Sequence, residues 1–387
     1  MKRSKWALLA VLLGVMVAMS GCFGGRYATG GVTGFVYEPP EGETTPYFGK
    51  PLVAGKPLQN ARVTATGTRG FAVTDENGCF KLTGIPVGSQ TITISNPSYK
   101  PKSIKVRIPA YDILSLEEPI KLAGKGYYLL IGVGKGYTDE LWDSYDAYIE
   151  PLPPYFDPED YYLNAPGRDV SILRDVLVSH NRLKIGRVER LIDGEATWTA
   201  VVTALEDFSY VMNPEDYLVI YFSGHGVPDG ILLADSILSD AKFRYEILED
   251  IFPAGTDVTL ILDTCYSGSF ADKNEEFIPL VPPGAGSKAF AGQGYTVIAS
   301  SRPTELSHVR DPKSEVEPSI FTYYLVQAIR NGNADINFDG VITVQEVYNY
   351  VEWRVQNESL SRYGLKQNVY VWLYDSSSVI ATYPVDY

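Results

Sequence analysis

From residue 127 onward, short apolar runs alternate with segments of helical periodicity, and this alternation restricts the folds open to the chain. The strand-like runs read YYLLIGVG (127–134), GRVERLID (186–193), YLVIYFSG (217–224), VTLILDTC (258–265), YTVIASS (295–301) and NVYVWLYD (368–375). Most are continuously apolar, which is typical of strands buried on both faces of a sheet. Helical spacing marks residues 167–181, 197–212, 242–252 and 320–332. Residues 127–375 are therefore predicted to form an α/β domain, a mostly parallel sheet flanked by helices.

Residues 27–110 follow a different pattern, in which apolar and polar side chains alternate along short segments separated by turn formers such as DENG and IPVG. This pattern predicts a small all-β sandwich ahead of the α/β domain. The order of the segments resembles the carboxypeptidase-regulatory-like β-sandwich, for which we expect a spacer role without catalysis. Residues 111–126 are expected to be a linker.

The N-terminal 22 residues resemble the signal peptide of a bacterial lipoprotein. Three basic residues within the first five positions precede an apolar run at 6–19 that is too short for a comfortable membrane span. The sequence SGC resembles a lipobox, which implies cleavage before Cys22 and lipidation of that cysteine. An ordinary secretory signal is the alternative. With either signal the chain is expected to leave the cytosol. The lipoprotein signal implies a location in the cell envelope, on the extracytoplasmic side, with the protein anchored to a bacterial membrane through lipid alone.

The charge of the chain argues against one class of partner. The formal net charge is −14, and no basic cluster occurs beyond the N-terminus. Nucleic-acid binding requires a basic footprint, so we expect no nucleic-acid partner.

Two predicted strands end in residues that carry chemistry. YLVIYFSG leads into His225, and VTLILDTC ends at Cys265. Because parallel strands present their carboxyl ends at one sheet edge, the imidazole and the thiol should meet there, where the imidazole can activate the thiol. We expect the backbone N–H groups of Gly226 and Cys265 to form an oxyanion hole. The alternative is a structural histidine and a disulfide between Cys79 and Cys265.

The segments YFSGHG and LILDTCYSGSF, together with LNAPGRDVSILRDVL, IASSRPTE and PSIFTYYLVQAI, resemble the caspase/metacaspase superfamily of cysteine peptidases, in its metacaspase-like form. The resemblance implies His225 as general base and Cys265 as nucleophile, with a thioester acyl-enzyme. It also implies a pocket for arginine or lysine at Asp169, Ser223 and Asp263. Asp169 could instead cap a helix, and Asp263 could orient a neighbour. The spacing of 40 residues from His225 to Cys265 is shorter than is usual in the family.

The other candidate residues lie outside this set. Residues 267–294 form a long Gly- and Pro-rich loop, and Lys273 and Lys288 are candidate self-cleavage points by analogy with the family; an uncut surface loop is the alternative. His180 and His308 are expected at the surface, although His308 could approach the cleft.

The segment DINFDGVITVQE (335–346) fits the calcium-binding loop of an EF-hand at every liganding position. The expected Ca²⁺ ligands are Asp335, Asn337, Asp339, the Val341 carbonyl, Thr343 and Glu346. A helix–loop–helix turn with incidental acids is the alternative. No organic cofactor is expected.

Together these features predict a lipid-anchored cysteine endopeptidase acting on proteins or peptides with basic residues. The competing hypothesis is a non-catalytic surface scaffold that keeps a caspase-like fold as a docking domain. A free thiol at Cys265 favours the first hypothesis, and a disulfide to Cys79 favours the second.

Overall fold

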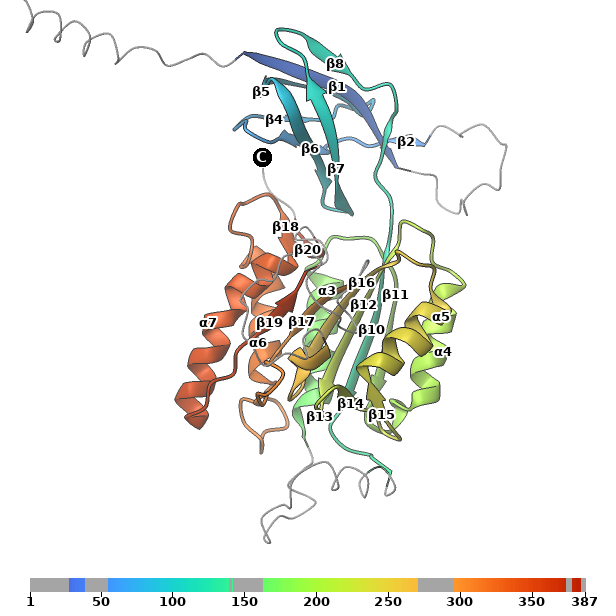
Figure 1. Cartoon of the computed structure of the whole chain (residues 1–387), viewed down its shortest axis with the longest axis vertical. Coiled ribbons are helices and arrows are strands. Elements are labelled where there is room, and N and C mark those ends of the chain that lie inside the picture. Colours follow the sequence, from blue (N-terminus) through green and yellow to red (C-terminus); the bar gives the residue numbers. More distant parts are fainter. Residues whose placement is uncertain are drawn as a thin grey trace, which may run out of the picture. The chain divides into compact units, whose positions relative to one another are not determined.

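The computed structural model describes residues 28–38, 55–138, 141, 163–270, 295–373 and 378–383. The described chain forms two compact units, the first ending at Leu122 and the second beginning at Ala123, with Pro97–Lys100 counted with the second. Figure 1 shows the β-rich first unit and the helix-flanked sheet of the second. The predicted lipoprotein segment, with Cys22, lies outside the described residues.

The first unit contains two sheets. One has the order β2-β1-β5, with β8 and β9 also pairing with β1, and the other has the order β4-β3-β6-β7. The strands are β1 (Thr29–Glu38), β2 (Lys56–Pro57), β3 (Arg62–Ala65), β4 (Phe71–Val73), β5 (Cys79–Pro86), β6 (Gly88–Asn96), β7 (Tyr99–Ile108), β8 (Ile113–Ser115) and β9 (Ile120–Lys121). Alternating residues such as Val63, Ile92 and Ile94 are fully buried, as the period-two pattern predicts.

Residues 111–126 differ from the expected linker, because β8 and β9 pair in parallel with β1 and complete the first sheet. The short apolar stretches ILS and IK are too brief to stand out as strands in the sequence. Cys79 begins β5, and its side chain is exposed because alternate residues of this strand face solvent.

The second unit is built on a six-stranded sheet of order β11-β10-β12-β16-β17-β19. Its strands are β10 (Gly126–Val133), β11 (Ile185–Ile192), β12 (Tyr217–Gly224), β16 (Asp257–Asp263), β17 (Tyr295–Ala299) and β19 (Tyr370–Trp372). All neighbours pair in parallel except β19, which is antiparallel to β17. Every residue of β10 and β12 is buried, which explains their uninterrupted apolar sequences.

Helices cover both faces of this sheet (Figure 1). One face packs against α3 (Ala165–Ser179), α6 (Ile320–Ile329) and α7 (Val344–Tyr363); the other packs against α4 (Trp198–Ser209), the π-helical segment η3 (Lys242–Leu248) and α5 (Glu249–Ile251). Successive residues of β10 point to opposite faces of the sheet. Tyr128 and Leu130 belong to the hydrophobic core on the α3 side, and Leu129 and Ile131 belong to the core on the α4 side.

The remaining short elements were not predicted from the sequence. A three-stranded sheet of β13 (Gly226–Val227), β14 (Gly230–Leu232) and β15 (Ile237–Ser239) follows His225. The strand β18 (Val341–Thr343) pairs with β20 (Val379–Thr382), so β19 is not the last strand. The 3-10 turns are η2 (Asp193–Glu195), η4 (Ser267–Phe270) and η5 (Arg330–Gly332).

Candidate active site

The candidate site lies beyond the carboxyl ends of two neighbouring parallel strands, β12 and β16. Ser223 near the end of β12 pairs with Asp263 at the end of β16, so the turns that follow begin side by side. Gly226 packs directly on the second turn, because a Cβ at this position would stand 2.3 Å from Thr264 Oγ1 and 2.5 Å from the Cys265 carbonyl oxygen. Glycine is therefore required here for the two turns to approach one another.

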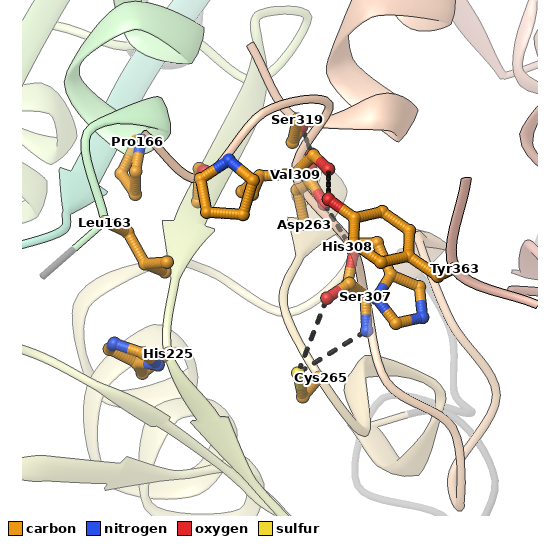
Figure 2. A pocket seen from close by; sticks show the side chains of 13 residues that line it. Leu163, Pro166, His225, Asp263, Cys265, Ser307, His308, Val309, Ser319 and Tyr363 are labelled. Carbon is orange, nitrogen blue, oxygen red and sulfur yellow. Dashed lines mark hydrogen bonds between the residues drawn. The ribbon is translucent and has the colours of Figure 1, made fainter. Parts of the chain in front are cut away.

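These turns border a cavity of about 240 Å³. Its lining residues are Leu163, Pro166, Ser223, Gly224, His225, Asp263, Cys265, Ser307, His308, Val309, Pro312, Ser319 and Tyr363. Figure 2 shows His225 on one side of the cavity and Cys265, beside Ser307, on the other. The structure thus places the predicted imidazole and thiol at one cavity, with open space between them.

The His225 side chain is half-buried and lies next to an aromatic ring. The centres of the His225 and Tyr137 rings are 6.0 Å apart with a tilt of 49°. Tyr137 is itself fixed, because its hydroxyl donates a 2.7 Å hydrogen bond to the carbonyl oxygen of Val133 at the end of β10. A rigid neighbour limits the orientations open to the imidazole.

Cys265 is a free thiol, as is Cys79, so the disulfide considered from the sequence does not form. Its Sγ lies 3.4 Å from the Ser307 backbone N–H, which donates to it, and 3.7 Å from the Ser307 carbonyl oxygen (Figure 2). Burial raises the pKa of the Cys265 thiol, and the Ser307 N–H opposes that rise by stabilising the thiolate. The thiol therefore needs a base to become a nucleophile at neutral pH.

The backbone after the thiol adopts an uncommon conformation. Tyr266 has a φ of 59°, which non-glycine residues rarely adopt, and its N–H donates to the Glu305 carbonyl oxygen at 2.8 Å. Such conformations persist where the surrounding contacts enforce them, and they concentrate at functional sites. Cys265, the residue just before this turn, lines the cavity.

The three predicted pocket residues are brought together in a buried hydrogen-bond network. Ser223 Oγ donates to Asp169 Oδ2 at 2.7 Å, and the Ser319 backbone N–H donates to Asp169 Oδ1 at 2.9 Å. Ser319 Oγ donates to Asp263 Oδ2, which also accepts a 2.7 Å bond from Thr322 Oγ1. Ser319 therefore bridges the two carboxylates. Ser223, Asp263 and Ser319 line the cavity, whereas Asp169 is fully buried one layer behind them.

Both carboxyl groups have perturbed acidities. Burial raises the pKa of Asp169 well above its ordinary value, and the negative charge of Asp263 raises it further. Burial also raises the pKa of Asp263, while hydrogen bonds from Ser319, Thr322 and Ser307 oppose the rise. A cation placed between two such groups would be attracted strongly, since it relieves their mutual repulsion.

Two alternatives considered for these aspartates have different outcomes. Asp169 lies inside α3, whose N-cap is Asn164, so it is not a helix cap. Asp263 does orient a neighbour, because its Oδ1 accepts a 2.9 Å bond from Ser307 Oγ. The same carboxylate thus borders the pocket and fixes the residue against which the thiol rests.

Sequence reasoning missed the residues that hold this site together. Gln367 Nε2 donates to Ser307 Oγ at 3.0 Å, and Gln367 Oε1 accepts the His308 N–H at 2.9 Å. His308 is half-buried and lines the cavity, as the alternative considered for this residue predicted. Its ring stacks 4.6 Å from that of Tyr363, and burial lowers its pKa. A serine before an apolar helix could have marked Ser319 as a cap; no local pattern marks Gln367.

Other predicted residues lie apart from this cavity or outside the described chain. Residues 335–346 form the turn that leads through β18 into α7, and none of them lines the cavity. Lys273 and Lys288 lie outside the described residues. In the described part of the chain, no helix has both the length and the apolar character needed to cross a membrane.

A family model described as the caspase domain matches residues 156–376, and one described as the carboxypeptidase regulatory-like domain matches residues 52–117. Among solved structures, 248 chains match. One is the crystal structure of caspase-1 from Spodoptera frugiperda, with 12% identity and a TM-score of 0.43, covering 68% of this chain and 90% of that chain. No curated protein gave a match.

Proposed function

The chain belongs to the caspase domain family, as predicted from its sequence, and we propose that it is a cysteine endopeptidase that cleaves after arginine or lysine. Family membership supports the cysteine peptidase class. The specificity rests on one observation, a pair of buried carboxyl groups: Asp263 lines the cavity that also contains His225 and Cys265, and Asp169 lies directly behind its wall.

In the proposed mechanism, His225 accepts the proton of the Cys265 thiol, and Sγ attacks the carbonyl carbon of the scissile peptide bond. The raised pKa of the thiol makes this base necessary. The backbone N–H groups of Gly226 and Cys265 stabilise the oxyanion of the tetrahedral intermediate. Protonated His225 then donates its proton to the leaving amine. Water, deprotonated by His225, hydrolyses the remaining thioester and restores the thiol.

The side chain preceding the cleaved bond would enter the cavity toward Ser223, Asp263 and Ser319. A guanidinium or ammonium group gains from the carboxylates there, whereas an acidic side chain would add a third negative charge to a buried pair. Substrates with basic residues are thus favoured over acidic ones.

The remaining parts of the proposal rest on the sequence. Cys22 would carry the lipid that anchors the enzyme to a bacterial membrane on its extracytoplasmic side. The first unit would act as a spacer. Cleavage of the loop after Lys273 or Lys288 would accompany activation. The acidic chain would have no nucleic-acid partner.

The test uses the full-length chain, solubilised in detergent, with fluorogenic peptides that end in arginine or aspartate, under reducing conditions and with or without Ca²⁺. We expect cleavage of the arginine peptide that is lost in Cys265→Ala and His225→Ala and retained in Cys79→Ala. The last variant is a matched control, because Cys79 is the exposed free thiol of the first unit.

Other results would change the proposal in defined ways. Cleavage only after aspartate would support the peptidase activity but refute the proposed pocket for basic side chains. No cleavage, even after limited proteolysis of residues 267–294, would favour the non-catalytic scaffold. Mass spectrometry of the incubated protein would show whether the chain is cut after Lys273 or Lys288.

A further inference from the structure

A second group of acidic residues lies in the turn at 335–346, separate from the residues that line the active-site cavity. Backbone N–H groups of this turn donate hydrogen bonds to side chains of the same turn. The buried Asp335 accepts the Gly340 N–H at 2.9 Å, Asn337 Oδ1 accepts the Asp339 N–H at 2.9 Å, and Asp339 Oδ1 accepts the Val341 N–H at 2.9 Å. Gly340 has a φ of 81°, the left-handed conformation that this sharp turn requires.

Glu346 supplies an independent observation. Its side chain is only 6% exposed, and Oε2 accepts hydrogen bonds from the Thr343 N–H and Oγ1, each at 2.9 Å. The other oxygen, Oε1, is buried and has no hydrogen-bond partner. A buried carboxylate oxygen without a partner is costly and calls for a ligand that satisfies it.

The electrostatics of the turn indicate the charge of that ligand. The carboxylates of Asp335 and Asp339 lie close enough to that of Glu346 to repel it. Three carboxylates that repel one another, one with a buried unsatisfied oxygen, would be stabilised by a cation. Because all of the available side-chain donors are oxygens, the matching cation is a hard one.

We propose that residues 335–346 bind Ca²⁺ through Asp335, Asn337, Asp339, Thr343, Glu346 and the backbone carbonyl of Val341. Within the described ranges, no three His, Cys, Asp or Glu side chains are gathered as a ready-made metal centre. In this loop, however, half of the ligands are amide, hydroxyl and carbonyl oxygens. The carboxylates therefore have to close around the ion, with Glu346 contributing the oxygen that now lacks a partner.

The position of the turn predicts what the ion would stabilise. Val341–Thr343 form β18, which pairs with β20, and α7 begins at Val344 (Figure 1). The Tyr383 hydroxyl, from the residue after β20, donates to Asp335. An ion held here would tie the start of α7 to the β18–β20 pair. The expected effect is on stability, and it does not depend on the proposed peptidase activity.

The test measures Ca²⁺ binding by calorimetry, and thermal unfolding, on the full-length chain. We expect one Ca²⁺ per chain with a Kd of about 10⁻⁴ M, as for extracellular calcium modules, and an increase in Tm as Ca²⁺ is added. Glu346→Gln keeps the capping interaction with Thr343, since glutamine also serves at this position, but it loses the bidentate carboxylate. This variant should bind at least about tenfold more weakly and lose the increase in Tm.

Glu352→Gln is the matched control, because Glu352 is an exposed carboxylate on the same helix. It should bind Ca²⁺ as the wild type does. The proposal is overturned if the wild type shows neither binding heat nor a Ca²⁺-dependent Tm at 10-fold excess over the expected Kd, or if Glu346→Gln binds with unchanged affinity.

Discussion

Replacing Asp169 by asparagine removes one negative charge behind the cavity while leaving its shape. Asparagine can keep the two hydrogen bonds, with Oδ1 accepting the Ser319 N–H and Nδ2 donating to Ser223 Oγ. The variant should therefore fold, and its effect on catalysis should be mainly electrostatic.

The size of the expected loss in kcat/KM follows from the distance between the Asp169 carboxylate and a cation bound in the cavity. Asp169 lies 2.7 Å behind Ser223 Oγ, so a guanidinium that contacts that hydroxyl stands roughly 5–6 Å from the carboxylate. At an effective dielectric constant of ~20, this attraction is worth about 3 kcal/mol. We expect kcat/KM for an arginine peptide to fall about 100-fold. A citrulline peptide, which has nearly the same shape without the charge, should be cleaved equally by both proteins.

The pH dependence gives a second readout. Only the ionised pair attracts the cation, so arginine cleavage by the wild type should weaken as the pH falls through the raised pKa of Asp169. The folded-state pKa lies above the unfolded value near 3.8, so the native protein binds more protons, and stability falls as the pH rises between the two values. The variant should lose less stability over that range in urea titrations. An arginine rate within threefold of wild type, or an equal loss with citrulline, would refute the pocket assignment.

Two further predictions concern the supports of the thiol. Gly226→Ala should lower kcat about 100-fold, because the new Cβ would stand 2.3 Å from Thr264 Oγ1 and push apart the turns that carry His225 and Cys265. A peptide assay at saturating substrate measures this change. An unchanged kcat would argue against the prediction. Ser307→Ala removes the hydroxyl that donates to Asp263 and accepts from Gln367, and should cost about 1–3 kcal/mol of unfolding free energy in urea denaturation. An unaltered midpoint would show that these bonds contribute no net stability.

The sequence predicted the large elements of the second unit because their strands are buried on both faces and their helices have one apolar stripe. The apolar run at Tyr217–Gly224 is β12, and its parallel pairing with β16 follows from the alternation of strands and helices. The short pairs β13–β14 and β18–β20 were missed, since two to four residues carry too little periodicity to be recognised.

The sequence likewise predicted only part of the candidate site. The sequence predicted that His225 and Cys265 meet at one sheet edge, because each follows a strongly patterned strand, and both line one cavity. Asp169, Ser223 and Asp263 were implied by the family resemblance, and the structure joins them in one hydrogen-bond network. The position of Asp169 behind the cavity wall could not be read from the sequence. It depends on the depth to which α3 packs against the sheet.

One residue, Ser319, belongs both to the proposed substrate pocket and to the N-terminal cap of α6. Its hydroxyl accepts the Thr322 N–H at the start of α6 and donates to Asp263, while its own N–H holds Asp169. A mutation that retunes this pocket for a different side chain would therefore also loosen α6. Changes of preference are more accessible to evolution, or to an engineer, through side chains such as Val309 and Pro312, which line the cavity outside the network, than through the serine at its centre.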